Sequence, residues 1–206
     1  MIATLKDASL TLNSNREREL EKFDNLLREN PNDDNILYSK GLLLLDLDDN
    51  LEAIKCFDAA LNLNQDNVFA WHGKAVALRS LEKHEDAIIC FEKALEINPI
   101  NEIAWCEKSV ELIFLKNYKE AVNGFNRALR INDGNETAWY GKGIALRCLE
   151  MYSEALLCFD EALKINPFLS NVLYNKGATL LKLGSDEEER ICLDIASGKN
   201  PEFQEG

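Results

Sequence analysis

Several kinds of chemistry are excluded by what the 206 residues lack. The chain has only two histidines, His72 and His84, and its six cysteines include no CxxC pair. No Ser/His/Asp or Cys/His constellation and no glycine-rich phosphate loop is present, and these are the usual signatures of catalytic, metal and nucleotide sites. We therefore expect no catalytic residue, no metal site and no cofactor, and predict that the protein is not an enzyme.

Long apolar runs and an excess of basic residues are also missing. Apolar runs such as Leu42 to Leu45 are far shorter than the ~20 residues of a membrane-spanning helix. The N-terminus has no basic segment followed by an apolar one, as a secretory signal requires. The net charge of −13 opposes binding to nucleic acid and to anionic membranes. We expect a cytoplasmic protein whose partners are neither nucleic acids nor membranes.

What the sequence does contain is a repeat of 34 residues. All three tryptophans fall in one column of the repeat, and each of the four prolines follows an asparagine of another column. The predicted units are a partial capping repeat at 1–33, full repeats at 34–67, 68–101, 102–135 and 136–169, a degenerate capping repeat at 170–203, and a tail at 204–206.

Each unit has the pattern of two amphipathic helices. In the unit 136–169, Trp139, Gly143 and Leu146 recur at spacings of three and four, which predicts one face of a helix. The second half repeats this pattern around Phe159, and the short break between the halves predicts an antiparallel pair. Pro167 cannot continue the second helix, so each unit ends near its Asn-Pro step.

The unit resembles the tetratricopeptide repeat, whose signature is W-x2-L-G-x2-Y…A-x3-F…A…P. The matching residues are Trp139, Gly143, Ala155, Phe159, Ala162 and Pro167, whereas Lys142 replaces the usual Leu and Leu146 the usual Tyr. The resemblance implies an all-α fold, a right-handed α-solenoid of antiparallel helix pairs forming one continuous domain. It also implies protein binding in a concave groove lined by the first helices of the units.

The two ends of the array are expected to differ from its middle. Residues 14–29 are predicted to form a helix opened by the capping box Ser14-x-x-Glu17, with 2–12 as a separate weak helix. The second helix of the last unit, residues 186–197, is mostly polar and is interpreted as a cap.

The candidate binding site consists of the first-helix positions that do not build the core. These residues are Tyr38, Leu42, Phe69, His72, Val76, Arg79, Ile103, Glu107, Val110, Phe114, Tyr140, Ile144, Arg147 and Tyr174. Their aromatic and aliphatic composition is typical of a protein-binding surface, although such side chains also pack neighbouring repeats. The Lys and Asn that the resembled chaperone adaptors use to grip a terminal carboxylate are absent from the Tyr140 and Ile144 columns.

We therefore predict a non-enzymatic adaptor that binds a protein or peptide with apolar anchors. The alternatives are a self-assembling homo-oligomeric scaffold and, less favoured, a small-molecule regulator or an enzyme.

Three further columns or positions have two interpretations each. The column of Cys56, Cys90, Cys158 and Cys192 is interpreted as structural thiols, whereas Cys106 and Cys148 are candidates for reactive ones. The lysine column (Lys40, Lys74, Lys108, Lys142, Lys176) is either a ladder for an acidic ligand or a set of stems paired with second-helix carboxylates. Glu111 replaces small residues and is predicted to reach solvent or a partner's cation.

Overall fold

The fold was examined in a computed structural model, which describes residues 2–185 and 192–194 and, from Arg16 onward, their side chains. The described residues are helical, with turns between the helices and no strand. The helices are α1 (Ile2–Glu29), α2 (Asp34–Asp46), α3 (Asn50–Leu63), α4 (Val68–Ser80), α5 (His84–Ile97), α6 (Glu102–Phe114), α7 (Tyr118–Ile131), α8 (Glu136–Cys148), α9 (Tyr152–Ile165) and α10 (Ser170–Lys182). None of the described helices is long and apolar enough to cross a membrane.

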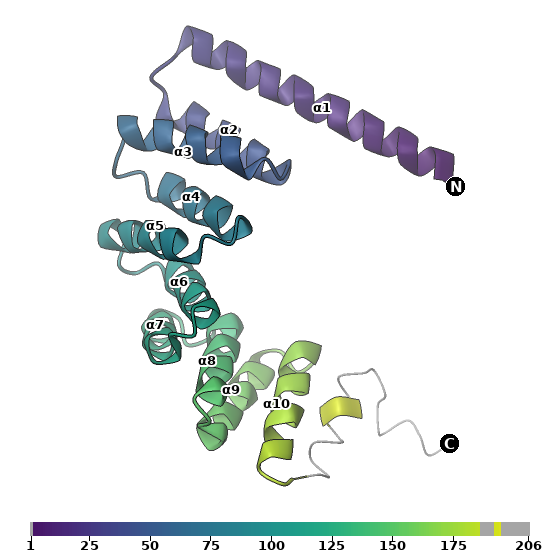
Figure 1. The fold of residues 1–206 in the computed structure, drawn as a ribbon, viewed down its shortest axis with the longest axis vertical. Helices are drawn as coiled ribbons and strands as arrows, with labels where there is room; N and C mark the ends of the chain where they lie inside the picture. The colour runs from purple at the N-terminus through teal and green to yellow at the C-terminus, as the bar shows by residue number, and fades with distance from the viewer. Residues whose placement is uncertain (1, 186–191, 195–206) are drawn as a thin grey trace. The chain divides into compact units, whose positions relative to one another are not determined.

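The chain divides into two compact units, Met1–Pro99 and Ile100–Gly206. In unit 1, α2 packs on α3 and α4 packs on α5, with α3 also against α4. In unit 2, α6 pairs with α7 and α8 with α9, and α10 packs on α9 (Figure 1). Each unit is thus a row of helix pairs, and α2, α4, α6, α8 and α10 begin at the first residue of a predicted repeat.

The turn inside each pair is built around a non-glycine residue with positive φ. Asp48, Glu82, Lys116 and Glu150 have φ near 60°, the left-handed region. In the first pair, Asp48 N–H donates to Leu45 O and Asp49 N–H to Leu44 O, which satisfies the free carbonyls at the end of α2. Because the turn is this short, the second helix of the pair runs antiparallel to the first.

Asparagine side chains start most of the first helices. Asn67, Asn101 and Asn135 each accept a hydrogen bond from the backbone N–H three residues later. The asparagine column noted in the sequence lies just before these caps. There Asn64 and Asn132 accept from the backbone N–H two residues on, closing the turn between repeats.

The core of each unit is organised by the phenylalanine column. Phe57, Phe91, Phe125 and Phe159 are fully buried. The ring of Phe57 lies against Gly41 of its own first helix and Gly73 of the next one, where an added Cβ would lie 2.6 Å from ring carbons. Phe159 likewise fills the space beside Gly143. A ring wedged between two backbones explains why glycine occupies these helical positions despite its low helix propensity.

The N-terminal prediction of two helices is wrong, because α1 is one continuous helix from Ile2 to Glu29. Neither glycine nor proline interrupts this stretch, so Ser14 and Glu17 lie inside the helix rather than at its start. Leu20 of α1 packs on the core of α2 and α3, whereas Leu26 is exposed. The predicted C-terminal capping helix lies mostly outside the described residues.

Candidate functional site

In unit 1 the predicted site residues lie on α2 and α4, and we call this set the first-helix face of unit 1. Its members are Tyr38, Leu42, Phe69, His72, Val76 and Arg79. The rings of Tyr38 and Phe69 lie 6.2 Å apart between centroids, so adjacent helices contribute to one surface. Phe69 is 70% exposed, which is a large apolar area for a residue that supports no core.

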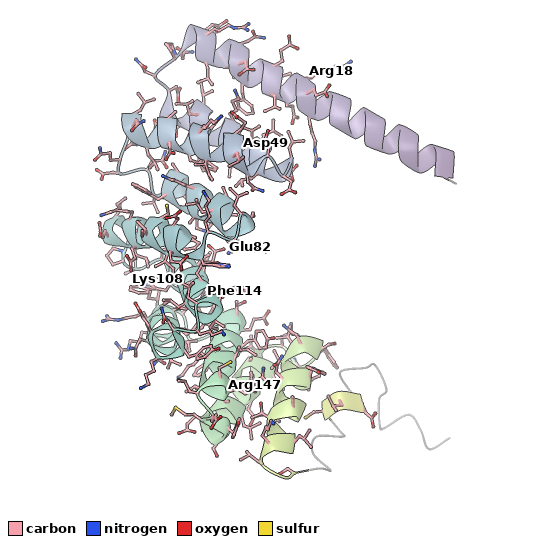
Figure 2. The ribbon with its side chains drawn as sticks, in the orientation of Figure 1. Arg18, Asp49, Glu82, Lys108, Phe114 and Arg147 are labelled. Atoms are coloured by element: carbon pink, nitrogen blue, oxygen red, sulfur yellow. The ribbon has the colours of Figure 1, made fainter. Side chains whose placement is uncertain are left out.

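In unit 2 the corresponding face lies on α6, α8 and α10, and we call it the first-helix face of unit 2. The predicted members are Ile103, Glu107, Val110, Phe114, Tyr140, Ile144, Arg147 and Tyr174, none of which is fully buried. Phe114 and Tyr174 are about equally exposed, at 61% and 60%. Figure 2 shows Phe114 on α6 and Arg147 on α8.

Tyr140 is held in place by the neighbouring helix. Nδ2 of Asn175 on α10 donates to the Tyr140 hydroxyl oxygen at 3.1 Å and to the backbone oxygen of Asn171 at 2.8 Å. Burial raises the pKa of the Tyr140 phenol, and the charge of Arg147 and a hydrogen bond from Asn171 oppose this rise. The hydroxyl is therefore protonated at neutral pH and free to use its own hydrogen as a donor.

One column assigned to the binding groove belongs to the core. The predicted groove included Glu107, but Gly73 and Gly141 of the same column are buried, and the rings of Phe57 and Phe125 occupy the space beside them. Only larger members of that column, such as Glu107 and Asn175, have exposed surface. The prediction failed because the helical period alone did not reveal that the phenylalanine of one repeat reaches into the next.

The lysine column supports the structural interpretation. Lys40, Lys74 and Lys176 pair at 2.6 Å with Asp24, Asp58 and Asp160 of the preceding second helix or α1. Lys74, Lys108 and Lys142 also lie over the faces of Trp71, Trp105 and Trp139 at 5.2–5.8 Å. The predicted pairing with second-helix carboxylates is confirmed for Asp58 and Asp160.

The cysteines behave as packing residues, apart from Cys148. All six are free thiols, and Cys90, Cys106, Cys158 and Cys192 are buried. Burial raises the pKa of Cys90 to about 11 and that of Cys106 to about 12. The candidate reactivity of Cys106 is therefore wrong, because its thiolate is suppressed at neutral pH. Cys148 is exposed.

Glu111 does not reach solvent. Its side chain is fully buried, as are Ala77, Ala145 and Thr179 in the same column. It therefore offers no charge at the surface to a partner, contrary to the prediction.

One further hollow lies in unit 1 beside the second helices α3 and α5. A cleft of 630 Å³ in unit 1 is lined by Asp58, Leu61, Asn62, Gln65, Asp66, Trp71, Lys93, Glu96 and Ile97. Its charged residues are largely paired within the chain: Asp58 with Lys74, and Glu96 with Lys93. No group of three or more potential metal-ligating side chains occurs in the described part of the chain.

Two residues of the first-helix face of unit 2 escaped the sequence prediction. Leu181 is 52% exposed on α10, and Asn171 lies beside Tyr140. Leu181 shares the column of Arg147, which was the available signal. Asn171, at the start of α10, shares the column of the predicted residues Phe69 and Ile103, which was the available signal there.

Family models of the tetratricopeptide repeat match most of the chain. One matches residues 68–101 and 137–169, and a second matches 34–67 and 103–135. The comparison with curated proteins found no significant match.

Solved structures with the same arrangement of helices include proteins of this family. YrrB, described as a TPR protein with an unusual peptide-binding site, is 26% identical, with a TM-score of 0.73 over 89% of this chain and 95% of its own. MamA from Desulfovibrio magneticus RS-1 is 16% identical, with a TM-score of 0.76 over 84% and 97% of the two chains. A tetratricopeptide repeat protein from Parabacteroides merdae is 18% identical, with a TM-score of 0.80 over 95% and 77%.

Proposed function

Because the chain belongs to the tetratricopeptide repeat family, we propose that it is a non-enzymatic adaptor which binds a segment of a partner protein on its first-helix faces. The observation that carries this proposal is the exposure of aromatic side chains there. Phe69, Phe114 and Tyr174 are each at least 60% exposed, although none of them is needed to cover a core. Exposed aromatic groups on a rigid helical surface are typical anchors for a protein partner.

The composition of these faces supports a segment with apolar anchors. Val76 on α4, Val110 on α6 and Ile144 on α8 belong to these faces and are themselves partly exposed. The similarity to YrrB, described as having a peptide-binding site, points in the same direction.

The test is capture of partners by the full chain, compared among matched variants. Phe69→Asp and Ile144→Asp place a charge on the first-helix faces of units 1 and 2. Leu157→Asp is the control, because Leu157 is 65% exposed on the second helix α9. We expect the first two variants to lose the partner and the control to keep it, with unchanged circular dichroism in all three. A partner retained by both first-helix variants would show that it binds elsewhere.

A second candidate function is self-assembly through the second helices. Leu157 and Ile89 are 65% and 53% exposed at corresponding positions of α9 and α5. If these side chains join copies of the chain, light scattering will give a mass that rises with concentration, and Leu157→Asp will return it to the monomer. A constant monomeric mass rules this alternative out.

A further inference from the structure

Arg147 is a cation whose Nε lacks a hydrogen-bond partner among the residues that the structure describes. It lies on α8 in the first-helix face of unit 2 and is only partly exposed. Its Nε is buried and donates no hydrogen bond within the part of the chain that the structure describes. No described carboxylate lies within 4.0 Å of its guanidinium nitrogens. A partly buried N–H that has lost water and gained no acceptor is unfavourable, so the position is suited to an anion supplied from outside.

Unit 2 also contains a partly buried cation that has a structural ion pair. Lys176 on α10 is similarly shielded, and it pairs with Asp160 at 2.6 Å. In a chain with a net charge of −13, carboxylates for such pairs are abundant. The lack of one beside Arg147 is therefore a property of this site and not of the composition.

A second donor lies close to Arg147. The Tyr140 hydroxyl, on the same helix, is oriented by the hydrogen bond that its oxygen accepts from Asn175, so its own hydrogen is available. Tyr140 and Arg147 are seven residues apart on α8, about two helical turns, so both side chains lie on the same side of this helix. A guanidinium and a phenol hydroxyl on one face form a donor set that matches a carboxylate.

Apolar side chains lie on both sides of this donor set. Leu181 on α10 occupies the column of Arg147, and Phe114 on α6 occupies the adjacent column. The two are 52% and 61% exposed, and both α6 and α10 contact α8. A bound segment can therefore continue past Arg147 in either direction, which suits an acidic side chain within the segment rather than the carboxylate at its end.

We propose that the first-helix face of unit 2 binds a partner segment that carries an aspartate or glutamate flanked by apolar residues. The carboxylate pairs with Arg147 and accepts from the Tyr140 hydroxyl, while the flanking residues pack on Phe114 and Leu181. This inference rests on the proposed adaptor function and specifies that the bound segment carries a negative charge. Arg147 thus selects an acidic segment on a protein whose overall charge would repel one.

The probe is a display library of random peptides, selected against the full chain. We expect selected peptides to share an acidic residue with apolar neighbours. Changing that residue to its amide should weaken binding by about tenfold, as expected for one charge-assisted hydrogen-bonded pair. Arg147→Gln should weaken the binding of the acidic peptide to a similar extent.

Exchanging the charges of Arg147 and of the peptide distinguishes a direct contact between them from a general effect of the protein's net charge. Arg147→Glu should bind the acidic peptide poorly and should recover affinity for the same peptide with lysine at the acidic position. Arg130→Glu is the matched control, because Arg130 is exposed on α7 of the same unit and the change in net charge is identical. A gain of affinity for the lysine peptide cannot result from misfolding.

The failures of the two proposals are distinguishable. If no peptide is selected, the adaptor function and this inference are both overturned. Selected peptides without a shared acidic residue, or equal effects of Arg147→Glu and Arg130→Glu, overturn the inference alone.

Discussion

A Cβ added to Gly73 of α4 would lie 2.6 Å from Cζ of Phe57 on α3 and 2.7 Å from its Cε1. The phenylalanine of the first full repeat thus fills a space that only glycine leaves open in the second. The ring is fully buried and has no alternative position without displacing the core of α2 and α3.

Gly73→Ala should therefore destabilise the protein by about 1–3 kcal/mol, because overpacking outweighs the gain in helix propensity. The free energy of unfolding in urea measures this loss. Gly134→Ala is the control, since the nearest atom to its new Cβ is Asn132 Oδ1 at 3.4 Å. Equal stability of Gly73→Ala and the native chain would contradict the close packing of the Phe57 ring against Gly73.

The side-chain cap of α4 supports a second prediction. Asn67 accepts from the backbone N–H of Ala70 at 3.0 Å, and its Nδ2 donates to Asp34 at 3.0 Å. Asn67→Ala should cost about 1 kcal/mol of stability. Lys83→Ala is the matched change, because Lys83 precedes α5 and makes no such side-chain hydrogen bond. Thermal unfolding of the two variants should differ, with only Asn67→Ala shifted downward.

Acid stability depends in part on Asp34. Hydrogen bonds from Asn64 and Asn67 lower its pKa below the ordinary value of 3.8. A lowered pKa means that this carboxylate stabilises the fold fully above pH 3.8 and loses that contribution as the pH falls through its lower folded value. Asp34→Asn should therefore lose less stability than the native chain on acidification. Urea unfolding at neutral pH and below pH 3.8 measures the difference, with Asp66→Asn as the control.

The thiols are predicted to differ in reactivity. Iodoacetamide at neutral pH should modify the exposed Cys148 and leave Cys90 and Cys106 intact, because burial raises the pKa of Cys90 to about 11 and that of Cys106 to about 12. Mass spectrometry after digestion identifies the labelled residues. Labelling of Cys106 at the rate of Cys148 in the folded protein would contradict its burial.

The raised pKa of Cys106 also predicts that the protein loses stability at alkaline pH. The folded state holds the Cys106 proton more tightly than the unfolded chain, whose thiol ionises near 9.0. This contribution is complete below pH 9.0 and is lost as the pH rises toward 12. Cys106→Ala should flatten the decline of stability in that range.

The helix pairs were predictable because the repeat displays the same buried positions several times. Phe57, Phe91, Phe125 and Phe159 recur in one column, so chance could not explain the pattern. The lysine stems were also predictable, since Asp58 and Asp160 recur at the matching place on the second helices.

The errors arose where a side chain acts across the boundary of a repeat. The role of Gly141 depends on Phe125, which belongs to the preceding repeat. The length of α1 does not follow from the repeat, so the motif Ser14-x-x-Glu17 wrongly predicted that a helix begins there. Arg147 Nε has no hydrogen-bond partner in the described part of the chain. This depends on residues of neighbouring helices, which a single sequence column does not predict.

The wedge of Phe57 also determines where the chain can be cut. One ring is covered by Gly41 of its own repeat and by Gly73 of the next, so a fragment that ends after α3 leaves it half exposed. A fragment that ends after α4 covers it completely. The smallest self-sufficient piece is therefore shifted by half a repeat from the 34-residue period of the sequence, and expression boundaries chosen from the sequence period alone would divide it.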